Sequence, residues 1–110
     1  MEVHKSKDGA ITVLSPEGRI DTTTAKQFEA AVMGAMAENN KIIVAFSKLD
    51  YISSAGLRVM LMAQKKMNAT KGTLVLTELP TNVHEVFKMS GFDKILKICG
   101  TMAESKQLFN

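Results

Sequence analysis

The sequence has 110 residues, which is enough for one domain, and 45% of them are hydrophobic while 23% are charged. Basic residues outnumber acidic ones by 14 to 11, so the formal net charge is only +3 and is spread along the chain. Aromatic residues make up 5%, and Trp is absent. Without a basic stripe or an aromatic stacking platform, this composition argues against nucleic-acid binding.

Cysteine content and hydropathy exclude further classes. The single cysteine, Cys99, cannot form an intrachain disulfide or a cysteine-rich zinc site. The first residues lack the apolar segment of a signal peptide, and no apolar run is long enough to span a bilayer. We therefore expect one cytoplasmic domain over residues 1–110, with no cofactor, no metal site and no membrane contact.

The first half of the chain predicts a hairpin, a helix and a strand. Residues 10–14 alternate as a strand does, and a turn at 7–9 predicts a hairpin with a short strand near Val3. A helix is predicted after residues 18–24, and Thr24 and Gln27 match a capping box at its start. Residues 41–46 form a continuous apolar run, which is typical of a strand covered on both faces. The apolar residues of the helix recur at helical spacing, at Phe28, Ala31, Val32, Ala35 and Met36.

The second half predicts three helices and two strands. A helix opens at 53–56 and closes at 68–72, and residues 72–77 follow as a second buried strand. A short helix starts at 80–82, and Gly91 suits the position just past its end. Residues 95–98 predict a short last strand. Thr101 with Glu104 predicts the cap of a final helix.

Strands and helices therefore alternate, which predicts an α/β domain with a mixed, mostly parallel sheet of four to five strands and about four helices. Functional groups of such sheets gather at the carboxyl ends of the strands. Two loops that lead into helices, 18–24 and 49–56, occupy that position. If their strands are neighbours, Asp21 and Ser54 lie at the same end of the molecule. Tyr51 and Ile52 are expected to be the last buried residues before the second loop.

The polar residues of these loops each have two interpretations. Serine at 53 or 54 can cap the helix by accepting a backbone N–H. It can also carry a phosphate, because the helix dipole and free N–H groups face it, and the added charge would repel a docked partner. Asp21 either caps its helix or belongs to a partner-docking surface. A nucleophilic serine is disfavoured, because only His4 and His84 are available as a base and the segment is not a G-x-S-x-G elbow.

Three segments together resemble the family of STAS-domain anti-sigma factor antagonists. Residues 49–61 resemble its signature: an aromatic and an aliphatic residue, Asp-Ser-(Ser/Thr/Ala)-Gly-Leu, then an apolar helix. Residues 18–21 are similar to its Gly-x-(Leu/Ile)-Asp, and residues 86–95 to its late helix and Ser-Gly turn. The three motifs have the family's order and spacing over nearly the whole chain. One departure is Ser53, which stands where the family usually has Asp before the phosphoacceptor, and which offers a second hydroxyl for modification.

The resemblance implies a single STAS domain that regulates by binding and is not an enzyme. It implies that the unphosphorylated form binds a GHKL-type serine kinase that is also an anti-sigma factor. The kinase would then phosphorylate Ser54 and be released, and a PP2C-type phosphatase would reverse this. A monomer working in heterocomplexes is also implied. The implied partner-binding residues are Asp21, Thr22, Thr23, Ser53, Ser54, Ala55, Gly56 and Arg58.

Two alternatives belong to other classes. A STAS interaction subunit could instead control secretion, stress signalling or lipid transport without a sigma factor, because a fold does not fix its output. A small enzyme or nucleotide-binding protein is disfavoured, because the sequence has no phosphate-binding loop motif.

Overall fold

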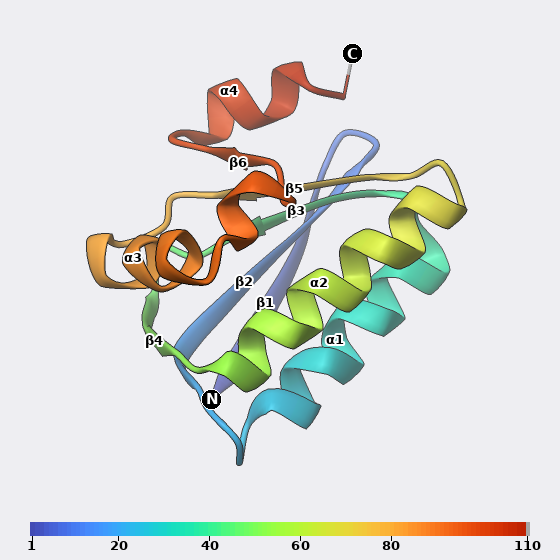
Figure 1. Cartoon of the computed structure of the whole chain (residues 1–110). Helices are drawn as coiled ribbons and strands as arrows, with labels where there is room; N and C mark the ends of the chain where they lie inside the picture. The colour runs from blue at the N-terminus through green and yellow to red at the C-terminus, as the bar shows by residue number, and fades with distance from the viewer. Residues whose placement is uncertain (110) are drawn as a thin grey trace.

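A mixed sheet of six strands organises residues 1–109, which are the residues that this computed structural model describes (Figure 1). The strands are β1 (Glu2–Asp8), β2 (Ile11–Ile20), β3 (Lys41–Ala45), β4 (Leu49–Ile52), β5 (Thr73–Thr77) and β6 (Ile98–Cys99). The helical elements are α1 (Ala25–Glu38), α2 (Ser54–Ala69), α3 (Thr81–Ser90), the 3-10 turn η1 (Phe92–Lys94) and α4 (Met102–Gln107).

The sheet is mostly parallel, as the alternation of elements predicts. β1 pairs antiparallel with β2, and the order β1-β2-β3-β5-β6 continues with parallel pairs. β4 pairs in parallel with the carboxyl-terminal end of β2. It is the strand that the sequence did not predict, because its two middle residues, Asp50 and Tyr51, are both exposed and break the alternation of a strand.

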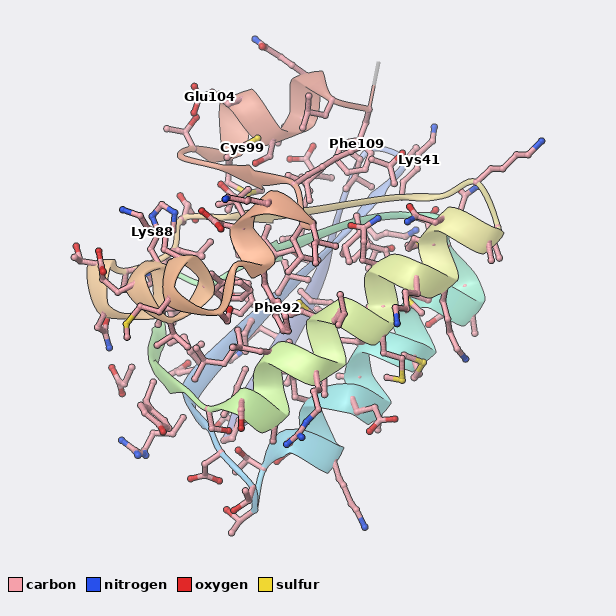
Figure 2. All side chains as sticks on the ribbon, in the orientation of Figure 1. Lys41, Lys88, Phe92, Cys99, Glu104 and Phe109 are labelled. Atoms are coloured by element: carbon pink, nitrogen blue, oxygen red, sulfur yellow. The ribbon has the colours of Figure 1, made fainter. Side chains whose placement is uncertain are left out.

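Helices cover both faces of the sheet unequally. α1, α2 and α3 pack on one face, where Phe46 of the β3–β4 connection lies between Phe28 and Phe87, with ring centroids 6.5 and 6.2 Å away. α4 covers the other face, where Cys99 and Phe109 pack against a smaller apolar cluster (Figure 2). β3 contributes alternate residues to both clusters, which explains its continuous apolar run. Burying a side chain such as Phe or Ile contributes about 1.5–3 kcal/mol, so this double burial anchors the sheet.

Two local predictions are wrong. The Thr24–Gln27 capping box does not form. The Thr24 hydroxyl donates to the carbonyl of Arg19, and the side-chain amide of Gln27 donates to the carbonyl of Met1. The last strand is shorter and later than the predicted 95–98: residues 95–97 follow the η1 turn outside any strand, Ile95 is exposed, and only Ile98–Cys99 pair with β5.

Two other local predictions are confirmed. Thr101 and Glu104 form a full capping box at the start of α4. Gly91 ends α3 in the left-handed conformation, at a φ of 79° that glycine tolerates without strain.

Candidate phosphorylation and docking site

The two loops singled out from the sequence lie together at one end of the molecule, where α1 and α2 begin (Figure 1). β4 carries the second loop alongside β2, with Ile20 opposite Ile52. The amide of Ser53 donates to the carbonyl of Ile20 at 2.8 Å, which fixes the start of α2 next to the turn at Asp21. The sequence-based expectation that Asp21 and Ser54 share one end is therefore confirmed.

Gly56 allows this close approach. A Cβ atom at Gly56 would lie 2.6 Å from Ile52 Cγ1 and 2.7 Å from Ile20 Cγ2, closer than carbon atoms pack. The first turn of α2 therefore sits directly on the ends of β2 and β4 only because residue 56 has no side chain. Gly56 is buried, so its contribution is to position Ser54 rather than to offer surface.

Asp21 organises the turn that leads into α1. Its Oδ1 accepts hydrogen bonds from the Thr23 hydroxyl at 2.6 Å, the Thr23 amide at 2.9 Å and the Thr24 amide at 3.2 Å. The Thr23 hydroxyl, followed by these amides, lowers the pKa of Asp21 below its ordinary value, because each bond favours the ionised carboxylate. These bonds give Asp21 a local structural role in the turn before α1, although the N-cap position of the helix is Thr24, while its role in docking stays a prediction.

The two serines at the start of α2 differ sharply. Ser53 occupies the N-cap position, yet its side chain makes no capping bond. Its hydroxyl oxygen is buried and has no hydrogen-bond partner within residues 1–109. Ser54 is the first residue of α2 and is exposed, and the first turn carries no acidic residue. Ser54 is therefore the accessible hydroxyl, and the unpaired N–H groups of the helix start favour a negative charge there.

Beside this helix start, Arg19 lies over the ring of Tyr51, with its guanidinium carbon 4.4 Å from the ring centroid. Its Nε is also 4.0 Å from a carboxylate oxygen of Asp21. The expectation that Tyr51 is buried is wrong: it is 37% exposed, because the strand turns this side chain outward under Arg19, whereas Ile52 is buried as expected. No sequence pattern indicates this pair, which only the pairing of β2 with β4 brings together.

A groove of about 320 Å³ runs between the first turns of α1 and α2. The structure brings three of the predicted partner-binding residues into it, namely Thr22, Ala55 and Arg58, whereas the hydroxyl of Thr23 is bonded to Asp21. The remaining lining residues were missed, although Thr22, Lys26 and Glu29 already follow helical spacing. They are Ala25, Lys26, Glu29, Val59 and Met62.

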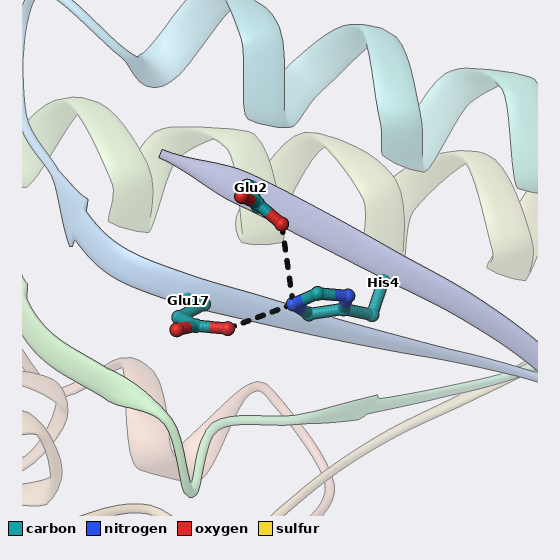
Figure 3. Close-up of side chains that lie close together, drawn as sticks. All are labelled: Glu2, His4 and Glu17. Atoms are coloured by element: carbon teal, nitrogen blue, oxygen red, sulfur yellow. Dashed lines mark hydrogen bonds and ion pairs between the residues drawn. The ribbon is translucent and has the colours of Figure 1, made fainter.

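The groups suited to metal binding or catalysis lie elsewhere. Within residues 1–109, one set of three possible metal ligands has its ligand atoms within 4.8 Å of one another: Glu2, His4 and Glu17, all exposed (Figure 3). His4 Nε2 already lies 2.8 Å from Glu17 and 3.7 Å from Glu2. The hydrogen bond from His4 lowers the pKa of Glu17, helped by the positive charge of Lys48. A cation bound by these three side chains would have to replace the hydrogen bond between His4 and Glu17.

The second histidine, His84, lines a separate hollow with Asp93 and Cys99. None of the hydrogen bonds found among residues 1–109 joins Ser54 to either histidine, so no general base activates its hydroxyl in this arrangement. A search of the same residues also finds no helix with the length and hydropathy needed to cross a membrane.

Fold and site together define a small α/β domain whose distinctive features are an exposed hydroxyl at the start of α2 and a groove between α1 and α2. The family model of the STAS domain matches residues 2–105. The chain therefore belongs to the STAS domain family.

Similar proteins carry a consistent description. BtrV of Bordetella bronchiseptica, described as a candidate anti-sigma factor antagonist, is 32% identical over 110 residues, which cover 99% of this chain and 95% of BtrV. A candidate anti-sigma factor antagonist from Thermotoga maritima has a TM-score of 0.89 at 22% identity, over 96% of this chain and 92% of its own.

A third similar protein, the anti-sigma factor antagonist SpoIIAA, has been solved in two states. The unphosphorylated form has a TM-score of 0.81 at 21% identity, over 98% of this chain and 96% of its own. The phosphorylated form, from Bacillus, has a TM-score of 0.73 at 20% identity, over 99% and 100%. At these identities, the solved structures show that the fold is shared.

Proposed function

We propose that this protein is an anti-sigma factor antagonist that acts by partner switching and has no catalytic activity of its own. The unphosphorylated form binds a GHKL-type serine kinase that is also an anti-sigma factor. Phosphorylation of Ser54 releases that partner, and a PP2C-type phosphatase restores the binding form. The names of the relatives, BtrV above all, support the antagonist role.

The observation that carries the proposal is the position of Ser54. Its side chain is exposed at the first position of α2, while the neighbouring hydroxyl of Ser53 is buried. A kinase can therefore reach Ser54 without unfolding the helix start. The N-terminal end of a helix also favours a bound phosphate, so the modified chain keeps its fold.

The surroundings of Ser54 explain how one phosphate could release a partner. Ser54 directly precedes Ala55, which lines the groove between α1 and α2, and it lies at the end of the molecule that carries the residues proposed to bind the partner. A phosphoserine adds about 1.5 to 2 negative charges. Like charges brought together in an interface cost several kcal/mol, so a partner with acidic groups at this position would dissociate.

The test is mass spectrometry of the protein after incubation with ATP and the GHKL-type kinase encoded nearest to its gene. We expect one phosphate on the peptide that contains Ser54, none in Ser54→Ala, and unchanged incorporation in the matched variant Ser53→Ala. Titration calorimetry should then show that the phosphorylated protein binds the kinase at least about tenfold more weakly.

Other outcomes have distinct meanings. Phosphate that persists in Ser54→Ala but not in Ser53→Ala would move the modification to Ser53. No phosphate from a kinase with demonstrated activity would contradict the switch and favour a STAS subunit that acts by docking alone.

A further inference from the structure

Arg58 lies one helical turn after Ser54 on α2, so the two residues are neighbours on the helix surface. Side chains of a helix lean toward its N-terminus, which means that a long side chain at residue 58 extends over the turn that carries Ser54. Arg58 is exposed, and no ion pair of its guanidinium is found within residues 1–109. Arg19, by contrast, is already held by Tyr51 and Asp21.

The other charged groups near Ser54 lie on other elements than α2. Asp21, in the adjacent turn, has its carboxylate bonded to Thr23 and Thr24. Lys26 and Glu29 come from α1 and line the far side of the groove that Arg58 lines. Asp50 lies on β4, three residues before the helix cap Ser53. Arg58 is thus the cation on the same helix face as Ser54, with no acidic residue in the first turn to compete for it.

We propose that Arg58 is the intramolecular counter-ion of phosphorylated Ser54. The planar guanidinium matches two phosphate oxygens, and such charge-assisted pairs are the stronger class of hydrogen bond. Phosphorylation then alters the docking surface twice: it adds a dianion, and it withdraws Arg58 from any contact with the partner. The regulatory consequence rests on the proposed function, whereas the pairing itself depends only on the presence of a phosphate.

The experiment uses the full chain with phosphoserine incorporated at position 54 during translation, so that no kinase is needed. The second pKa of the phosphate is followed by phosphorus NMR in the otherwise unaltered protein and in three variants. We expect Arg58→Gln to raise that pKa by about 0.15 to 0.4 pH unit, because loss of the cation disfavours the dianion. Arg58→Lys should restore part of the shift, and added salt should reduce it.

The matched control is Lys26→Gln, which removes the same charge from the opposite side of the groove. We expect it to move the phosphate pKa by less than half as much. Equal shifts in Arg58→Gln and Lys26→Gln, or no shift in either, would overturn the pairing.

A second measurement needs no substitution at residue 58. The Nε–H signal of Arg58 should move in the nitrogen–proton NMR spectrum between the unmodified and phosphorylated chains, and an unmoved signal would also overturn the pairing. Failure of the kinase to modify Ser54 would instead contradict the proposed function and leave this result standing.

Discussion

The starts of α1 and α2 lie side by side, yet they are built in opposite ways. In the turn before α1, Asp21 accepts hydrogen bonds from Thr23 and Thr24, and the Thr24 hydroxyl bonds back to β2. At α2, the N-cap residue Ser53 has a buried hydroxyl without a partner among residues 1–109, and Ser54 is exposed. The first start is closed by its own side chains, whereas the second is left open.

The difference indicates where stability and function separate. In the turn before α1 the amides of Thr23 and Thr24 are already bonded to Asp21, whereas the uncapped start of α2 keeps N–H groups and positive potential available for added charge. α2 compensates for its missing side-chain cap with close packing of Gly56 on Ile20 and Ile52. The open start is therefore held by apolar contact rather than by hydrogen bonds, which makes the comparison testable by separate substitutions.

The largest expected effect comes from breaking that packing. Gly56→Ala should lower the free energy of unfolding by about 1–3 kcal/mol, because the new methyl group overlaps side-chain carbons of Ile20 and Ile52. Gly34→Ala in α1 is the matched control, since no atom lies within 4 Å of its added Cβ. It should raise stability by about 0.5–1 kcal/mol, as alanine does in exposed helices. Urea denaturation measures both, and equal effects would contradict the packing account.

The second-largest effect is expected from removing the Asp21 carboxylate, which closes the turn before α1. Asp21→Ala removes the acceptor for three hydrogen bonds, and it should lower the melting temperature by less than Gly56→Ala does. Asp21→Asn keeps an oxygen in the same position and should lose less, because asparagine is also a good cap. Calorimetric melting curves decide the point. A melting temperature of Asp21→Ala equal to that of the unaltered protein would leave the carboxylate free for a purely docking role.

At the start of α2, removing the polar side chain should have the opposite effect on the free energy of unfolding. Ser53→Ala removes a buried oxygen that has no partner among residues 1–109, so stability should stay unchanged or rise by up to about 1 kcal/mol. Thermal melting next to Asp21→Ala shows the contrast directly. A loss of more than about 1 kcal/mol would mean that the Ser53 hydroxyl is hydrogen-bonded in solution, and the two helix starts would then be alike.

The sequence predicts the α/β class, the mixed sheet and the ends of most elements, because these follow from apolar periodicity and turn residues. It also places Asp21 and Ser54 at one end, since parallel neighbouring strands require it. It fails at β4, where Tyr51 is turned outward beneath Arg19 instead of being buried. That contact joins residues 32 positions apart, and no local pattern encodes it.

Capping shows the same limit within a single turn. The Thr24–Gln27 pattern predicts a capping box, but Asp21 accepts the amide of Thr24, and Thr24 is then free to bond Arg19. Asp21 and Gln27 are both possible acceptors for the Thr24 amide, and the ionised carboxylate of Asp21 is the stronger one. By contrast, Thr101 has no such competitor, and its predicted box forms. Lys26 and Glu29 line the groove only because α1 packs against α2, and the sequence did not predict their place in the site for that reason.

The smallest expected effect concerns pH. Hydrogen bonds, that of the Thr23 hydroxyl first, hold the pKa of Asp21 below its ordinary value of 3.8 in the folded chain. A carboxyl with a lowered folded pKa contributes stability that is present above its unfolded pKa and is lost as the pH falls through the folded pKa. The advantage of the unaltered protein over Asp21→Asn should therefore be constant at neutral pH and shrink below about pH 4. Glu17 and Glu38 also have lowered pKa values, but they are present in both proteins and leave the difference unchanged. Melting curves between pH 7 and pH 3 measure that difference, and a gap of unchanged size over this range would show that Asp21 stabilises the turn through shape rather than charge.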